Sequence, residues 1–109
     1  MVLHETSKAL QEKYTSSTLT TTELEHLVED FISAVGTNSL EYLGYNVNMS
    51  FMIYGMSKAA LNALTRIEAR EWAGVKNLLV VSVTPGFCAT DINQNASDAR
   101  PAKLGADSI

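Results

Sequence analysis

The apolar run from Leu78 to Val83 restricts the possible folds of this 109-residue chain more than any other segment. It is rich in β-branched residues and almost uninterrupted, which is typical of a parallel strand buried on both faces. Thr84-Pro85-Gly86 then ends the run abruptly. A helix, a short turn, a buried strand and a Pro-Gly break make half of a doubly wound α/β unit, in which ligands bind beyond the carboxyl ends of the strands. The sequence therefore predicts an α/β fold with part of a doubly wound parallel sheet.

Two amphipathic helices precede this run. The first begins at Thr20, which with Glu23 has the spacing of a capping box, and its apolar residues keep a helical period until Gly36. The second extends from about Ser50 or Phe51 to Trp72, and Gly74 ends it. Its apolar face consists of Met56, Ala59, Ala60, Ala63, Leu64 and Ile67. Because alanine side chains are small, we expect this face to approach the sheet closely.

Composition excludes several classes of function. The net charge is −4 and the eight Lys and Arg form no cluster, so neither nucleic acid nor a membrane is an expected partner. No apolar run approaches the roughly 20 residues of a membrane span, and the start of the sequence lacks the pattern of a secretory signal. We therefore expect a soluble, cytoplasmic protein. Cys88 is the only cysteine, so we expect no internal disulfide and no metal site.

Tyr54 and Lys58 are the strongest candidates for chemistry. They lie four residues apart where the sequence predicts a helix, so their side chains should be neighbours. An ammonium group stabilises the phenolate form of a nearby tyrosine, and the pair could therefore act as a general acid/base near neutrality. The alternative is a tyrosine and a lysine that happen to share a half-exposed helix face, since such pairs are common.

Other polar and aromatic residues have simpler interpretations. From Thr37 to Asn48 the composition predicts a loop, whose Tyr42 and Tyr45 could line a substrate cleft or pack the loop onto the domain surface. The second interpretation is the simpler one. His26 lies among acidic residues of the first amphipathic helix, which favours a surface histidine over a catalytic or metal-binding one.

The combination of Tyr54-x-x-x-Lys58 on a helix with a following strand and Pro85-Gly86-x-x-x-Thr90 resembles the short-chain dehydrogenase/reductase family. Within it, the chain is similar to the monomeric NADPH-dependent carbonyl reductases. The resemblance implies a Rossmann-like fold, NADP(H) as cofactor, a small-molecule carbonyl substrate and a monomer. It also implies that residues 1–109 are a fragment of a single domain. Within this fragment we expect a helical insertion at 10–36, a catalytic helix at 50–73, and a strand with a cofactor loop at 77–91.

The same resemblance assigns roles to the acid/base pair. It implies that Tyr54 donates a proton to the carbonyl oxygen of a ketone, aldehyde or quinone while hydride comes from the nicotinamide. It implies that Lys58 holds the ribose hydroxyls of the cofactor. By the same resemblance, Tyr54 also contacts NADP(H).

The loop after the run carries the other implied contacts. Pro85, Gly86 and Cys88 would lie along the nicotinamide, and Thr90 would reach its carboxamide or phosphates. Phe87 would form a wall of the substrate pocket, at a position where these reductases usually carry tryptophan. Cys88 could instead sense redox state, but a small apolar residue beside the cofactor is the simpler interpretation.

Several parts of the family's site have no counterpart in the sequence. The glycines are scattered singly, so no glycine-rich turn is present to bind the pyrophosphate. The catalytic serine and asparagine of the family would precede Met1, and its last strand and helix would follow Ile109. We therefore expect a fragment of the C-terminal half of the domain, truncated at both ends and inactive alone. The alternative is a non-catalytic product that binds a partner or does not fold independently.

Overall fold

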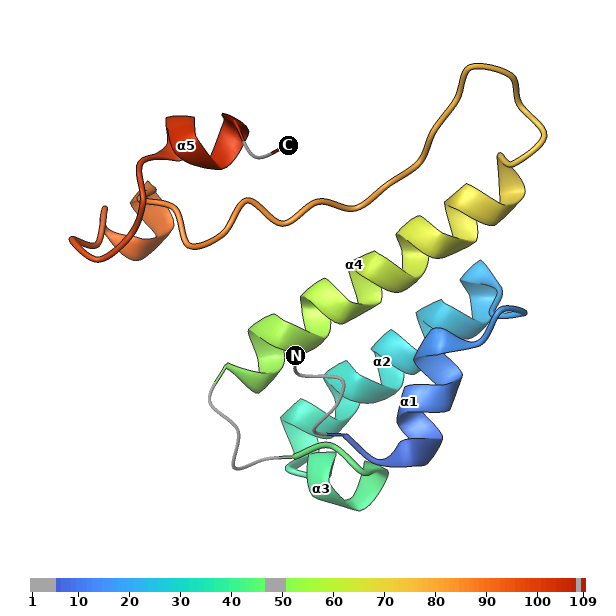
Figure 1. Cartoon of the computed structure of the whole chain (residues 1–109). Helices are drawn as coiled ribbons and strands as arrows, with labels where there is room; N and C mark the ends of the chain where they lie inside the picture. The colour runs from blue at the N-terminus through green and yellow to red at the C-terminus, as the bar shows by residue number, and fades with distance from the viewer. Residues whose placement is uncertain (1–5, 47–50, 108) are drawn as a thin grey trace.

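The computed structural model of the chain describes residues 6–46, 51–107 and 109, and it is built mainly from helices (Figure 1). The elements are α1 (Lys8–Thr15), α2 (Thr21–Thr37), α3 (Leu40–Leu43), α4 (Met52–Glu71), a short 3-10 helix (Asp91–Asn93) and α5 (Ala102–Asp107). Among these described helices, none combines the length and the apolar character needed to cross a lipid bilayer.

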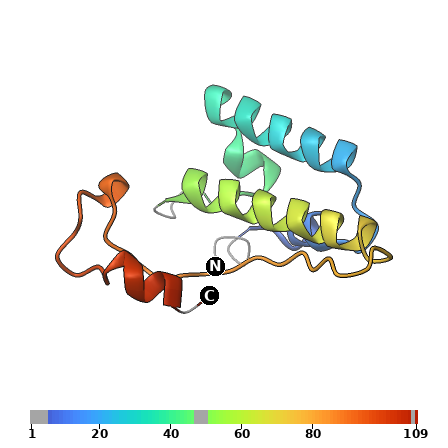
Figure 2. The ribbon, with the colours of Figure 1, turned by 90° about the horizontal axis from the view of Figure 1, so that it is seen from above.

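The predicted partial doubly wound parallel sheet is wrong, because no described segment forms a β-strand. The run from Leu78 to Val83 is instead a single chain that passes beside α4 (Figures 1 and 2). Leu79 is 83% exposed and Val81 is 61% exposed, so these side chains are not buried although the run is apolar. A strand needs hydrogen-bonded neighbours, and no other described segment lies against this run as a strand. Among the residues that the structure describes, the backbone pairs in β-fashion only at an isolated parallel bridge between Cys88 and Arg100.

The predicted helices are present, with small differences at their ends. Thr20 caps α2, since its hydroxyl accepts a hydrogen bond from the backbone N–H of Glu23 at 3.2 Å and donates to the carboxylate of Glu23 at 3.0 Å. The helix does not stop at Gly36 as predicted. It continues to Thr37 and ends where Asn38 adopts a left-handed conformation with φ of 55°. Of the two predicted starts of α4, Ser50 lies outside the described residues, and Phe51 is the residue directly before the helix.

The core lies where α4 packs on α1 and α2, with α4 between α2 and the extended run (Figure 2). Its fully or nearly buried side chains include Tyr14, Leu24, Phe31, Met52, Met56, Ala59, Ala63 and Ile67. The alanines of α4 therefore permit close approach to other helices and not to a sheet. The apolar stripe was read correctly from the sequence, but its packing partner was not.

Two arginines of α4 hold the end of α1 and the turn that follows it. Nη2 of Arg66 donates to the carbonyl of Tyr14 at 2.9 Å. The guanidinium of Arg70 donates to the carbonyls of Ser17 and Leu19. Cations are favourable at the carboxyl end of a helix, where carbonyls lack intrahelical partners. These contacts fix α1 against the helix that carries Tyr54 and Lys58.

A buried tyrosine pair connects α1 to the segment after α3. The hydroxyl groups of Tyr14 and Tyr45 are 2.8 Å apart and hydrogen-bonded, and the ring of Tyr45 meets Phe31 edge-on at 4.9 Å between centroids. Tyr45 is 3% exposed, whereas Tyr42 is 92% exposed. The interpretation in which the loop packs on its own tyrosine is thus confirmed for Tyr45. The short α3 within this stretch was not predicted.

Stability is expected to fall above about pH 10 because of this pair. Burial raises the pKa of both Tyr14 and Tyr45, and the carboxylate of Asp30 raises both further. An unfolded tyrosine has a pKa of about 10. Above that pH the unfolded chain loses protons that the folded chain keeps, so the contribution present below about pH 10 is lost as pH rises.

Urea melts between about pH 8 and pH 11 would measure this effect. Replacing both Tyr14 and Tyr45 by phenylalanine should flatten the alkaline decline, whereas Tyr42→Phe should leave it unchanged. An equal decline in the double variant would show that other groups cause it.

Candidate functional site

A cleft of about 620 Å³ lies between α4 and the extended chain before and at the Pro-Gly break. From α4 it is lined by Tyr54, Lys58, Leu61, Asn62 and Thr65, and from the extended chain by residues 81–86. Lys58 is the only charged side chain among these lining residues. The cleft therefore combines a phenol, a cation and a stretch of backbone, which suits a polar ligand that carries hydroxyl groups or negative charge.

Tyr54 and Lys58 lie side by side, as their spacing on a helix predicts. The ammonium of Lys58 is 5.5 Å from the centroid of the Tyr54 ring, a cation–π contact. Tyr54 is 59% exposed, so its phenol is accessible from the cleft. The hydroxyl of Ser57 donates to the carbonyl of Tyr54 at 2.6 Å and is thus turned back onto the helix. The proximity of the pair is observed, and its catalytic role stays a prediction.

Only part of the predicted cofactor loop lines this cleft. Pro85 and Gly86 belong to its lining, but Phe87, Cys88 and Thr90 do not. Phe87 is 56% exposed, which leaves its ring available as a wall for a ligand outside the cleft. The structure thus brings together Tyr54, Lys58, Pro85 and Gly86 and places the other three predicted residues further along the chain.

Arg100 organises this loop, and nothing in the sequence pointed to it. Its backbone N–H donates to the carbonyl of Phe87 at 2.9 Å, and its carbonyl accepts from the N–H of Ala89 at 2.7 Å. Gly86 has a φ of +85°, and a Cβ there would lie 3.3 Å from the guanidinium of Arg100. Glycine is favoured at this position for both reasons.

Asn93 and Gly105 complete the support of the loop. The amide of Asn93 donates to the carbonyl of Cys88 at 2.7 Å, and its oxygen accepts from the N–H of Thr90 at 3.0 Å. The spacing Thr90-x-x-Asn93 is close to that of a capping box and is the signal that could have identified Asn93. Gly105 of α5 is buried, and a Cβ there would collide with the sulfur of Cys88. α5 therefore packs directly on the loop.

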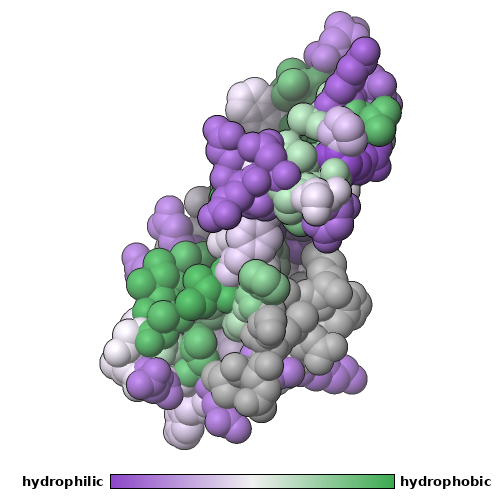
Figure 3. Space-filling view, turned by 90° about the vertical axis from the view of Figure 1, so that its left-hand side faces the viewer, coloured by the Kyte–Doolittle hydropathy of each residue, from purple (hydrophilic) through white to green (hydrophobic). Residues whose placement is uncertain are grey.

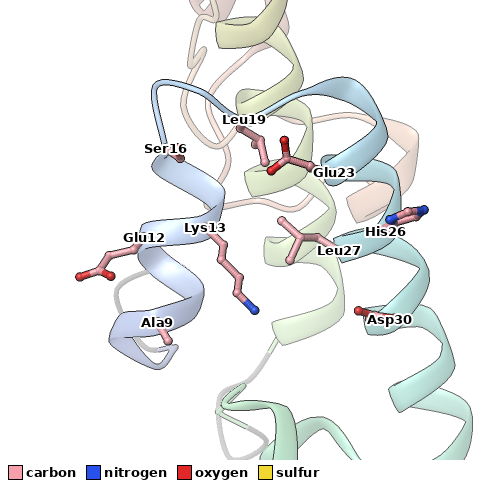
Figure 4. Close-up of a pocket in the computed structure, with 9 residues that line it drawn as sticks. All are labelled: Ala9, Glu12, Lys13, Ser16, Leu19, Glu23, His26, Leu27 and Asp30. Atoms are coloured by element: carbon pink, nitrogen blue, oxygen red, sulfur yellow. The ribbon is translucent and has the colours of Figure 1, made fainter.

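A second hollow of about 590 Å³ lies between α1 and α2 (Figure 4). Lys13, Glu23 and Asp30 project into the gap, whereas Glu12 and His26 point away from it (Figure 4). His26 is exposed, which confirms the interpretation as a surface histidine. Within the described ranges, no three His, Cys, Asp or Glu side chains are grouped to hold a metal ion. The hollow lacks the phenol and the loop contacts of the Tyr54–Lys58 cleft.

Comparison with known proteins gives two findings. Residues 1–107 match the family model described as Enoyl-(Acyl carrier protein) reductase. A relative in Capsicum annuum, (+)-neomenthol dehydrogenase, is 32% identical over 94 residues, which are 86% of this chain and 28% of that protein. The chain thus spans less than a third of the length of that relative.

Proposed function

Because this chain belongs to the short-chain dehydrogenase/reductase family, a family of NAD(P)-dependent oxidoreductases, we propose that it supplies the proton-donating part of an NADPH-dependent carbonyl reductase. The substrate would be a ketone, an aldehyde or a quinone, and the product the corresponding alcohol or hydroquinone. The observation that carries the proposal is the cleft in which Tyr54 and Lys58 face Pro85 and Gly86.

The residues of this cleft fit the nicotinamide and ribose part of NADP(H). Lys58 can donate hydrogen bonds to ribose hydroxyls, and the backbone of Pro85 and Gly86 lines the opposite side of the cleft. When bound, the cofactor supplies hydride to the carbonyl carbon. The remaining part of the cofactor has no equivalent support here, since no glycine-rich turn occurs in the sequence. NADPH rather than NADH rests on the resemblance to carbonyl reductases.

Tyr54 would perform the chemical step that belongs to this chain. Its hydroxyl donates a proton to the carbonyl oxygen as negative charge develops there. Lys58 lies against the ring of Tyr54, where its positive charge stabilises the phenolate that remains after proton transfer. Its ammonium thus serves both the cofactor ribose and the proton donor.

The loop residues would orient cofactor and substrate. The resemblance gives Pro85, Gly86 and Cys88 backbone contacts along the nicotinamide and gives Thr90 a contact with its carboxamide or phosphates. Pro85 and Gly86 line the cleft, whereas Cys88 and Thr90 would have to reach the cofactor from outside it. Phe87 is the exposed aromatic side chain of this loop and would form a wall for the substrate. The named activity of the Capsicum annuum relative supports an alcohol–carbonyl couple as the substrate class. We also propose a cytoplasmic, monomeric enzyme without nucleic-acid or membrane partners.

A hybrid enzyme tests the proposal. The 94 aligned residues of the neomenthol dehydrogenase are replaced by their counterparts from this chain, so that Tyr54 and Lys58 become the acid/base pair of the hybrid. We expect oxidation of NADPH that depends on an added ketone, aldehyde or quinone. The 109-residue chain assayed alone should give none, because cofactor binding and positioning supply much of the rate. A folded hybrid that binds NADPH but reduces no carbonyl compound would contradict the proposal.

A further inference from the structure

A groove of about 410 Å³ runs between α2 and α4 on a side of α4 that the proposed reaction does not use. Its lining consists of Thr21, Leu24, Glu25, Val28 and Glu29 from α2 and of Ser57, Ala60, Leu61 and Leu64 from α4. Only Leu61 also lines the Tyr54–Lys58 cleft. The two helices run in opposite directions, so the groove is bounded by one antiparallel helix pair (Figure 1). We call it the α2/α4 groove.

The apolar surface of this groove extends beyond its lining. Ile32 lies one turn after Val28 on α2 and is 63% exposed, and Ile53 lies one turn before Ser57 on α4 and is 58% exposed. Because the helices are antiparallel, both isoleucines continue the groove at the same end. Hydrophobic side chains gather on one face of the helical part of the molecule in Figure 3. Large apolar side chains that stay exposed together are typical of interaction surfaces.

Negative charge borders the same groove. Glu25 and Glu29 are four residues apart on α2, so their carboxylates lie on one edge, and both are exposed. No lysine or arginine contributes to the lining. An occupant must therefore cover an apolar floor and present positive charge to the α2 edge.

We propose that the α2/α4 groove binds a basic amphipathic helix of a partner protein. A third helix can lie between two antiparallel helices and bury an apolar stripe in the groove that they form. From Leu24 to Ile32 the α2 side spans nine residues, about 12 Å between the first and the last. That length fits a partner with apolar residues at i, i+4 and i+7 and with lysines or arginines beside them.

Charge argues against a second copy of this chain as the occupant. A two-fold pair across this groove would bring Glu25 and Glu29 of one copy near the same residues of the other. The chain already carries a net charge of −4, so such a pair would lack compensating cations at this edge. A basic helix removes this repulsion and turns both carboxylates into attractive contacts.

Fluorescence anisotropy of a labelled peptide with the whole 109-residue chain tests the proposal. The probe is an amphipathic peptide of leucines and lysines, about five turns long so that it exceeds the groove. We expect saturable binding that weakens as salt rises, because exposed charges are screened. A peptide of the same composition in scrambled order, and one with glutamate in place of lysine, should bind at least about tenfold more weakly.

Matched variants locate the binding site. Replacing Glu25 and Glu29 together by glutamine should weaken binding about 5- to 20-fold, and Ile32→Ser should weaken it about threefold or more. Replacing Glu12 and Glu41 together by glutamine removes the same charge elsewhere and should change little. The proposal would be overturned if the two double variants had equal effects or if the scrambled peptide bound equally well. Self-association of the free chain through this groove would overturn it too. An unfolded chain that gains no helicity with the peptide would overturn it as well.

Discussion

Tyr54→Phe in the hybrid enzyme is expected to lower kcat by about 10²- to 10⁴-fold, the usual contribution of a positioned general acid. The substitution removes one hydroxyl that lies on an exposed side chain and leaves the ring under Lys58 in place. Folding and cofactor affinity should therefore change little. Steady-state kinetics with a carbonyl substrate, together with an NADPH titration by fluorescence, would separate the loss of the chemical step from a loss of binding.

Tyr42→Phe is the matched control for this prediction. Tyr42 is 92% exposed on α3, outside the cleft, so the same removal of a hydroxyl should leave kcat unchanged. If Tyr54→Phe and Tyr42→Phe gave the same rate as the parent hybrid, Tyr54 would not be the proton donor.

Ile67→Ala is expected to lower the free energy of unfolding of the chain by about 2–5 kcal/mol. Ile67 is 2% exposed and lies where α4 packs on the other helices, so truncation leaves a cavity in the core. A small domain has only several kcal/mol of stability, so this loss would unfold much of the population. Urea denaturation followed by far-UV circular dichroism would measure it.

Ile53→Ala is the same substitution on the exposed face of the same helix. Ile53 is 58% exposed, so we expect a loss of about 0.5 kcal/mol or less. Both substitutions remove the same side-chain atoms from the same helix, so the difference between the two losses follows the difference in burial. Equal losses, or the absence of a cooperative transition in the parent chain, would contradict the helical core described above.

Local signals in the sequence predicted the helices well. The Thr20 and Glu23 spacing identified the start of α2, and the apolar period of α4 identified the side chains that become buried. These features depend on residues within a few turns of each other, which a single sequence displays directly. The predicted end of α2 at Gly36 was wrong because glycine can remain inside a helix, and Asn38 is the left-handed residue that ends it.

The predicted strand failed because a strand depends on residues far away in the chain. The apolar composition from Leu78 to Val83 favours burial of these side chains only if other segments of the chain pack against them. Burial requires pairing partners and helices on both faces. The described residues provide no paired strand, and α4 lies beside the run on one side only. In the candidate site, helix spacing was enough to place Tyr54 beside Lys58. The contacts of Arg100 and Gly105 with the loop arise from chain folding after the loop, for which the sequence offers no local pattern.

Transfer of deuterium in the hybrid enzyme is the most direct test of the proposed function. The hybrid is given NADPH deuterated at the transferring carbon of the nicotinamide and an unlabelled ketone, and the product is analysed by mass spectrometry. A reductase that uses Tyr54 and Lys58 should place the deuterium on the carbinol carbon of the alcohol, and Tyr54→Phe should slow the appearance of this labelled alcohol. Alcohol without deuterium, or labelled alcohol formed at the same rate by Tyr54→Phe, would contradict the account.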